Sequence, residues 1–296
     1  KELAQIGQSP AWRGHSDTET LLAAISAWGI EPTLARARGM FAFAAWDRQE
    51  RRLHLARDRI GEKPLYYGFC GDTFLFASEL KALREHPSWR GEIDRDALTS
   101  FMRFGYVPAP HSIFHGIRKL MPGTTLTLDL QSRKTSHSVF WSASNKIAEI
   151  APPFAGTPDE ATEQLHDLLK QAVAEQMISD VPHGAFLSGG IDSSMIVALM
   201  QSQSRRPVRT FTIGFDEQAY NEAVHAKAIA AHLGTEHSEF YLRPQEAIDA
   251  VSLMPRIFDE PLNWMALCPV IGRYEPRTPE LTEVVDFAIE EYQKKQ

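Results

Sequence analysis

The feature that most constrains the fold is a glycine-bearing turn between a short apolar strand and an apolar helix, in AFLSGGIDSSMIVALMQ, residues 185–201. Further strand-like and helix-like runs follow it, VRTFTIGF (208–215) and NEAVHAKAIAAHLG (221–234). Alternating β and α elements indicate parallel strands, because parallel neighbours need crossover connections. The second half of the chain is therefore predicted to form part of a doubly wound parallel sheet.

The residues of this turn are typical of an anion site. Gly189 and Gly190 lack Cβ atoms, so backbone N–H groups can close on a phosphate, and the following helix directs its positive end there. Three hydroxyl donors belong to the same turn: Ser188, Ser193 and Ser194. The turn has no lysine, which excludes the Walker loop, and it lacks the G-x-G-x-x-G spacing. The alternative is a plain strand-to-helix turn with a Ser/Asp cap.

Asp192 adds a carboxylate to this turn. A carboxylate repels bare phosphate, so its presence indicates a magnesium ion that bridges it to phosphate oxygens. Donors without a lysine suit pyrophosphate that leaves after attack at the α-phosphorus. We therefore predict that the turn binds ATP through its β- and γ-phosphates.

The first half is predicted to consist of strands joined by tight turns, with helices beside them. Residues 17–29 read as a helix, and two hairpins follow, with turns at 47–52 and at Gly71-Asp72. A short helix is expected within 78–87, another helix within 93–108, and a closing pair of strands within 117–130.

The periodicity fails around residues 144–158, where three prolines and no apolar stripe indicate a linker. The predicted domains are therefore residues 1–143 and 159–296. An amphipathic helix opens the second domain, with apolar residues at helical spacing: Leu165, Leu168, Leu169, Ala172 and Val173.

Composition excludes several classes of protein. The formal net charge of −7 argues against nucleic-acid and anionic-membrane partners, which need a basic face. No apolar run approaches the roughly 18 residues of a membrane helix. The two cysteines provide neither a disulfide framework nor a metal site. A cytoplasmic enzyme is expected.

FLSGGIDSS (186–194) resembles the pyrophosphate loop of ATP pyrophosphatases, and its surroundings resemble the glutamine-hydrolysing asparagine synthetases. The resemblance rests also on SDVPHGAFLSGGIDSSMIVALM, TFTIGF and YNEAVHAKAIAAHLGTEH. It implies that Leu187 and Ile213 contact adenosine. It also implies that residues 188–194 hold pyrophosphate and that Asp192 binds magnesium. Ile213 alone reads equally well as a core strand residue.

GHSDTETLL, GMFAFAAWD, RDRIGEKPLYY and FASELKAL resemble the later part of a class II glutaminase domain. That resemblance implies a four-layer αββα fold of the N-terminal-nucleophile type and assigns Asp17 to the α-amino group of glutamine. An N-cap is the alternative role for Asp17. RDRIGEKPLYY is expected to be architectural, with Arg57 and Asp58 able to pair.

The sequence also departs from the family. Position 1 is Lys1 rather than the N-terminal nucleophilic cysteine, so no catalytic residue is assigned, and Cys70 and Cys268 are expected to be inert. LNWMALCPVIGRYEPRTPELTEVVDF (262–287) stands where the family has a second loop of the SGDGGDE kind. The chain is expected to be truncated at both ends. The histidines His225, His232 and His237 lack partners at zinc spacing.

The function that the resemblance implies is an ATP-dependent carbon–nitrogen ligase. With magnesium, the parent enzyme would adenylate aspartate and amidate it with ammonia from glutamine, and a homodimer is compatible with the family. This chain is expected to lack glutaminase activity. Three alternatives stay open: a non-catalytic ATP-binding or interaction module, an amidotransferase acting on another carboxylate, and a flavodoxin-like carrier.

Overall fold

The computed structural model describes residues 2–7, 10–14, 16–149, 154–179, 181–215 and 221–261. The chain divides into two compact units, Lys1–Ala151 and Pro152–Gln296. Each unit has its own sheets and its own buried clusters. The division falls inside the segment 144–158 in which the sequence predicts a linker.

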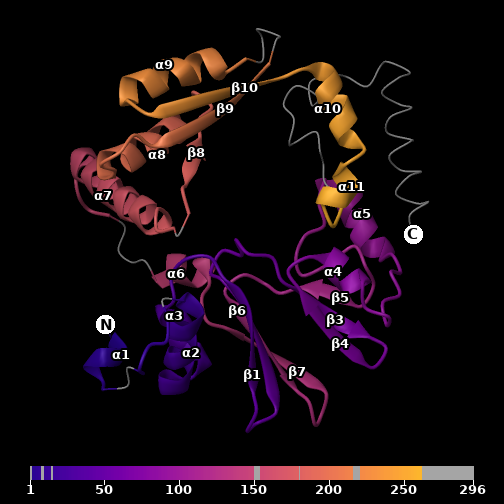
Figure 1. Ribbon diagram of the computed structural model, residues 1–296. Helices are drawn as coiled ribbons and strands as arrows, with labels where there is room; N and C mark the ends of the chain where they lie inside the picture. Colours follow the sequence, from indigo (N-terminus) through magenta and orange to yellow (C-terminus); the bar gives the residue numbers. More distant parts are fainter. Residues whose placement is uncertain are drawn as a thin grey trace. The chain divides into compact units, whose positions relative to one another are not determined.

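The first unit contains two antiparallel sheets (Figure 1). One has the order β1-β2-β6-β7 and is formed by Ala42–Asp47, Arg52–Arg57, Thr124–Asp129 and Lys134–Val139. The other has the order β4-β3-β5 and is formed by Thr73–Ala77, Tyr66–Cys70 and Ile117–Lys119. Alternating side chains of β3 reach both sides of its sheet, because successive residues of a strand point to opposite faces.

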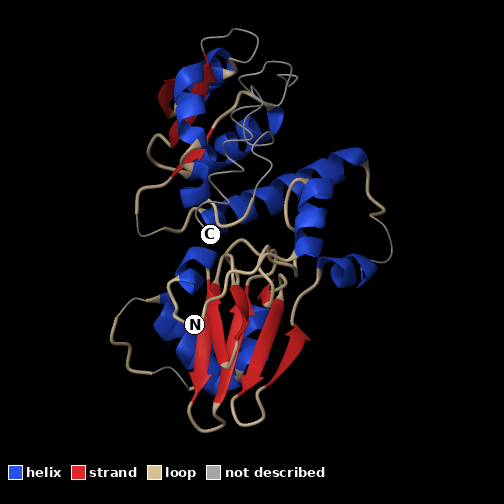
Figure 2. Cartoon of the chain, turned by 90° about the vertical axis from the view of Figure 1, so that its right-hand side faces the viewer, coloured by secondary structure: helices blue, strands red, loops and turns tan. Residues whose placement is uncertain are grey.

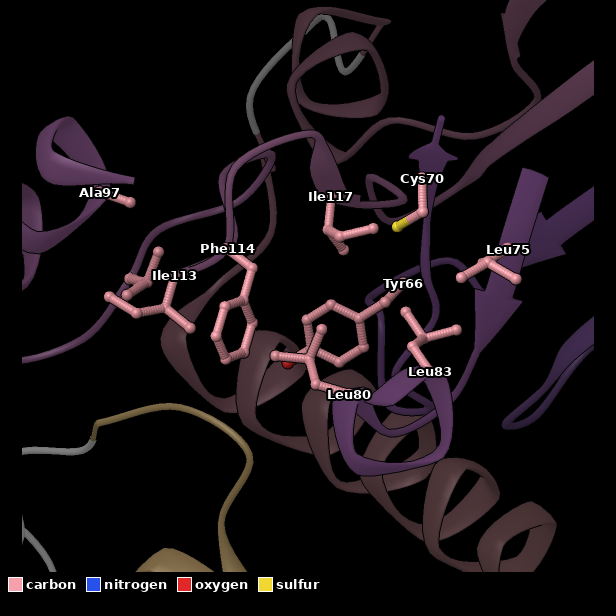
Figure 3. Packing of buried hydrophobic residues seen from close by; sticks show 10 residues of the cluster. Tyr66, Cys70, Leu75, Leu80, Leu83, Ala97, Ile113, Phe114 and Ile117 are labelled. Atoms are coloured by element: carbon pink, nitrogen blue, oxygen red, sulfur yellow. The ribbon is translucent and has the colours of Figure 1, made fainter. Parts of the chain in front are cut away.

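Two apolar clusters define the layers of this unit. Tyr67 and Phe69 of β3 pack with Leu55 and Leu126 of the other sheet, so this cluster lies between the sheets. Tyr66 and Cys70 of β3 face the opposite way. They pack towards helices α4 (Leu80–Arg84) and α5 (Arg95–Phe104), whose buried residues are Leu80, Leu83 and Ala97 (Figure 3).

Helices α2 (Asp17–Trp28) and α3 (Ile30–Arg36) lie on the side of the four-stranded sheet away from the other sheet (Figure 1). The short helix α1 (Glu2–Gln5) precedes them. The order of layers is therefore helix, sheet, sheet, helix, as predicted. α2 begins after the cap Ser16 and ends at Gly29, and both hairpins turn where expected, with Gly71 at φ 62°.

One strand pairing predicted in this unit was wrong, and one strand was missed. β5 and β6 do not pair with each other, because β5 joins β3 in one sheet and β6 lies between β2 and β7 in the other. β7 was not predicted, since its residues KTSHSV are almost all exposed and give no apolar alternation. The register of β7 is set by its partner β6, because all residues of β6 pair with β7.

The predicted linker begins with a short helix, α6 (Ala143–Glu149), none of whose described residues is buried. Local bonds account for it: Ser142 Oγ accepts from Asn145 N at 3.4 Å, and Lys146 pairs with Glu149 at 2.6 Å. The sequence had no apolar stripe there, and the helix forms without one.

The second unit alternates helices with parallel strands. Its sheet has the order β10-β9-β8, from Glu236–Leu242, Arg209–Phe215 and Gly184–Phe186. Its helices are α7 (Pro158–Gln176), α8 (Ile191–Gln203), α9 (Ala223–Leu233), α10 (Pro244–Val251) and α11 (Met254–Ile257). The parallel sheet was predicted. β10 was not, because EHSEFYL mixes charged and apolar residues on both faces.

Within the described residues, helices cover one face of this sheet. The buried face carries Thr210 and Thr212 of β9 and Ala185 of β8, which pack below α8 and its neighbours α7 and α9. The reason is topological. β8, β9 and β10 follow one another in one direction, and right-handed crossovers in one direction place their helices on the same side.

Candidate functional site

The glycine turn lies at the carboxyl end of β8, where open parallel sheets bind ligands. Leu187 N donates to Phe211 O at 2.9 Å, and Thr212 Oγ1 donates to Leu187 O. These bonds fix the start of the turn to β9. The chain then leaves the sheet through residues 188–190 and enters α8 at Ile191.

The serine side chains of the turn form a compact network. Ser188 Oγ and Ser193 Oγ lie 2.9 Å apart, and Ser193 Oγ also accepts from Ser188 N at 3.2 Å. Ser194 Oγ donates to Gly190 O at 2.6 Å. The hydroxyls of Ser188 and Ser193 are therefore held together at the N-terminal end of α8, where they can donate hydrogen bonds to an anion.

The two glycines have different roles. Gly189 has φ +82°, and a Cβ added there would lie 2.8 Å from the Cβ of His225 on α9. Gly190 has an ordinary φ of −75°, and among the described residues its added Cβ would meet only Ser188 Oγ, at 3.4 Å. Gly189 is thus needed for the fold, whereas Gly190 leaves open space above the hydroxyls. That space is what a bound phosphate requires.

The first turn of α8 offers free donors to this space. Among the residues that the structure describes, the N–H groups of Ile191, Asp192 and Ser193 have no acceptor, as is usual at a helix start. No side chain among the described residues caps the helix. Anions are stabilised at such a helix end by these N–H groups and the helix dipole.

Asp192 is exposed in the first turn of α8. The described part of the chain holds no cluster of three or more His, Cys, Asp or Glu residues that could bind a metal by itself. One carboxylate nevertheless fits magnesium, which keeps several waters and takes one or two carboxylates together with substrate phosphates. The residues present therefore fit a magnesium ion that arrives with a nucleotide. His225, His232 and His237 belong to no such cluster.

The two residues that the resemblance assigned to adenosine differ in the structure. The Leu187 side chain is buried with Val197 and Ala226, so only its backbone faces the carboxyl edge. Ile213 is half exposed and lies on the uncovered face of β9. Within the described chain, Ile213 is therefore not part of a buried core. Contact with adenosine stays a prediction for both Leu187 and Ile213.

Asp17 is exposed at the first position of α2. The N-cap is Ser16, whose Oγ accepts from Thr18 N at 3.1 Å. Asp17 Oδ1 also accepts from Thr18 N, at 2.7 Å. Glu19, which sequence reasoning did not single out, orders the preceding loop by accepting from Arg13 N and Gly14 N at 2.9 and 3.1 Å. The second oxygen of Asp17 remains available to a ligand, and the glutamine role stays a prediction.

The RDRIGEKP loop is architectural, but Arg57 and Asp58 do not pair with each other as expected. Asp58 is buried and accepts from Phe41 N, Glu62 N and Lys63 N at 2.8–3.2 Å. Arg57 donates to the carbonyls of Gly61, Lys63 and Leu120, each at 2.7 Å. Burial lowers the pKa of Arg57, an effect that the nearby Asp58 charge opposes.

Cys70 is buried at the end of β3, with its sulfur beside Ile117 (Figure 3). Burial raises the pKa of its thiol, which disfavours the nucleophilic thiolate. A cavity of about 350 Å³ adjoins it, lined among others by Asp72, Ser88 and Arg90. These features agree with an inert cysteine. Lys1 and Cys268 lie outside the described residues.

In a comparison with known proteins, each of the two units matches a family model. Residues 1–141 match the model of the glutamine amidotransferase domain, and residues 164–270 match that of asparagine synthase. The chain belongs to the asparagine synthetase family. Asparagine synthetase [glutamine-hydrolyzing] 1 of Bacillus subtilis is 36% identical over 255 residues, 86% of this chain and 39% of the relative. Putative asparagine synthetase [glutamine-hydrolyzing] 2 of Methanocaldococcus jannaschii is 32% identical over 251 residues, which are 84% of this chain and 47% of the relative.

This member of the asparagine synthetase family thus spans less than half the length of these relatives. A solved structure, the allosteric regulatory enzyme of purine biosynthesis, aligns with 82% of this chain and 56% of its own at 14% identity. Its TM-score is 0.33, too low to carry an argument. No helix in the described residues is long and apolar enough to cross a membrane.

Proposed function

We propose that this chain is part of a glutamine-hydrolysing asparagine synthetase and that residues 187–194 bind ATP with magnesium. One observation carries the proposal: the space above Gly190 is open and is bordered by Ser188 and Ser193 hydroxyls and by the free N–H groups of α8. Asp192, exposed in the first turn of α8, would supply a carboxylate to magnesium, which takes one or two from a protein.

The whole enzyme would use this site to activate a carboxylate. An oxygen of the aspartate β-carboxylate attacks the α-phosphorus of ATP, and pyrophosphate leaves with the bonding pair. Ammonia released from glutamine then attacks the acyl carbon, AMP leaves, and the amide nitrogen loses a proton. The Ser188 and Ser193 hydroxyls and the N–H groups of α8 would hold the departing pyrophosphate. Magnesium would neutralise part of its charge.

In the whole enzyme, the domain to which the first unit belongs would bind glutamine, with Asp17 on the substrate α-amino group. The net charge of −7 supports small-molecule substrates rather than nucleic acid or an anionic membrane, and we place the enzyme in the cytoplasm with other biosynthetic enzymes.

Calorimetry of ATP binding tests the nucleotide site. Gly190→Val should abolish ATP binding while leaving the melting curve nearly unchanged, because φ −75° suits valine and only Ser188 Oγ lies near. Asp192→Asn should remove the dependence of binding on magnesium. Asp167→Asn changes an equally exposed carboxylate on α7 and should bind like the wild type. Unchanged affinity in both Gly190→Val and Asp192→Asn would place the nucleotide elsewhere.

A further inference from the structure

The first unit contains a cavity that includes neither the nucleotide turn nor Asp17. Its volume is about 350 Å³, and it lies between the turn of the β3–β4 hairpin, residues 70–73, and the segment 87–90 that follows α4. Figure 2 shows the strands of this unit in red, with short turns joining neighbours. The volume is at the lower end of the roughly 300–1,000 Å³ typical of small-molecule sites. It suits a ligand larger than a bare phosphate or sulfate ion.

Hydrogen bonds hold both walls of this cavity in place. Gly71 has φ 62° and closes the hairpin between the paired ends of β3 and β4. In the opposite wall, Ser88 N donates to His86 Nδ1 at 3.1 Å, and Trp89 N donates to His86 O at 2.9 Å. Ser88 Oγ lies 3.3 Å from Thr73 Oγ1 and connects the two walls. The cavity is therefore preformed, which lowers the entropic cost of binding a ligand.

One unpaired cation, Arg90, lines the cavity. Among the described residues, Arg90 forms neither an ion pair nor a hydrogen bond. Burial raises the pKa of the Cys70 thiol in the cavity wall, and the nearby charge of Arg90 opposes this effect. Asp72 also lines the cavity, but Arg133 neutralises its carboxylate, with Arg133 Nη1 donating to Asp72 Oδ1 at 2.9 Å. Arg90 thus leaves one positive charge uncompensated, which favours an anionic ligand.

The other side chains of the cavity are of two kinds. The hydroxyls of Thr73 and Ser88 use one of their two protons for the bond between them, so the second proton is free to donate to a ligand. Cys70 and Trp89 form an apolar wall on the side of the core. The Trp89 ring is fixed edge-on against Phe114, with the ring centroids 5.0 Å apart. An anion that has an apolar body matches both kinds of group.

We propose that this cavity binds a small monocarboxylate with a compact apolar body. The carboxylate pairs with the guanidinium of Arg90, which presents parallel N–H groups to two oxygens. The hydroxyl pair of Thr73 and Ser88 donates to the same group. The apolar body lies against Trp89 and Cys70, a wall that a bare phosphate would leave uncovered. None of these residues belongs to the nucleotide turn or to the glutamine site, so this ligand is independent of the proposed function.

A titration with benzoate, followed by the indole N–H signals of the full chain in a nitrogen–proton correlation spectrum, tests this site. The chain has six tryptophans, and the signal that is lost in Trp89→Phe belongs to Trp89. At constant ionic strength, benzoate should shift the Trp89 signal to saturation. Benzyl alcohol, which has the same ring without the charge, should bind roughly tenfold more weakly. Inorganic phosphate should also bind more weakly than benzoate, because it has no apolar body.

Arg90→Gln should weaken benzoate binding roughly tenfold, because it removes the guanidinium charge, and it should leave the melting temperature unchanged. Arg84→Gln is the matched control. Arg84 is also exposed, at the end of α4, but does not line the cavity, so benzoate affinity should match the wild type. An unmoved Trp89 signal, or equal benzoate affinity in Arg90→Gln and the wild type, would overturn the proposal. So would benzyl alcohol or phosphate binding as tightly as benzoate. No nucleotide is present, so failure here is distinct from failure of ATP binding.

Discussion

Asp58 is the residue on which the loop between β2 and β3 depends most. Its buried carboxylate accepts hydrogen bonds from three backbone N–H groups. Asp58→Ala should lower the free energy of unfolding by about 3 kcal/mol or more, since it leaves three buried donors unpaired. Urea unfolding followed by tryptophan fluorescence measures the loss.

Asp72→Ala is the control for this change. Asp72 is 97% exposed and pairs with Arg133 at 2.9 Å, and exposed pairs contribute at most about 1 kcal/mol. Equal losses in the two variants would show that the contacts of Asp58 are not what stabilises the loop.

Gly189→Ala should destabilise the second unit by about 1–2 kcal/mol, because φ +82° is costly for alanine and its Cβ would press on His225. Gly190→Ala should change stability by less than about 1 kcal/mol. Thermal unfolding distinguishes them, and a larger loss at Gly190 would reverse the roles that we assign.

The sequence alone predicted which residues form the turn. It did not predict which of them are required by packing and which leave space for a ligand. Both glycines read as phosphate-loop residues, and only the position of α9 shows that Gly189 is fixed by packing. In the same way, Arg57 and Asp58 are adjacent and oppositely charged, which suggested a pair. Their partners are backbone atoms up to 63 residues away, and no local pattern encodes those.

At the scale of elements, β2 carries a histidine whose charge state affects the sheet. His54 Nδ1 lies 2.9 Å from Thr127 Oγ1 of β6. Burial lowers the pKa of His54 below its ordinary 6.5, with Arg52 acting in the same direction and Asp47 opposing it. The neutral form is therefore favoured in the folded state. Its contribution to stability is complete above pH 6.5 and is lost as the pH falls towards the lower, folded-state pKa.

His54→Gln should reduce the fall in melting temperature between pH 7.5 and 5.5, because glutamine keeps a hydrogen-bonding group and does not titrate. His137 on β7, whose pKa burial also lowers, should account for part of the remaining dependence. Calorimetric melts of the wild type and the single and double variants give the comparison. An unchanged pH dependence in the double variant would assign it to other groups.

Elements with a strong local signal were predicted, and those defined by their partners were not. Gly71 and Asp72 between two apolar runs give the second hairpin directly. β10 carries Glu236, His237 and Glu239, and it is a strand because all seven of its residues align with β9. Assignment of β5 and β6 to different sheets likewise depends on long-range pairing, which sequence periodicity does not contain.

At the scale of the whole molecule, the fold class follows from the order of elements and from two family resemblances, each confined to one half of the chain. The structure adds that the described residues of the two units are covered to different degrees. The first unit has both sheets and helices on either side of them. Within its described residues, 154–179, 181–215 and 221–261, the second has three strands, helices on one face and an exposed apolar face, a difference that no single motif could indicate.

This difference determines whether each unit should stay soluble after cleavage between them. The first cut by trypsin should fall at Lys146, because α6 buries none of its described residues and is held only by local bonds. Mass spectrometry of early time points identifies the site, and Lys146→Gln should slow the cut. The released second unit should aggregate, because within its described residues Phe186 and Phe211 are exposed and one edge of β8 has no strand partner. Two soluble pieces that each unfold cooperatively would show that the second unit is stable without the first, contrary to this expectation.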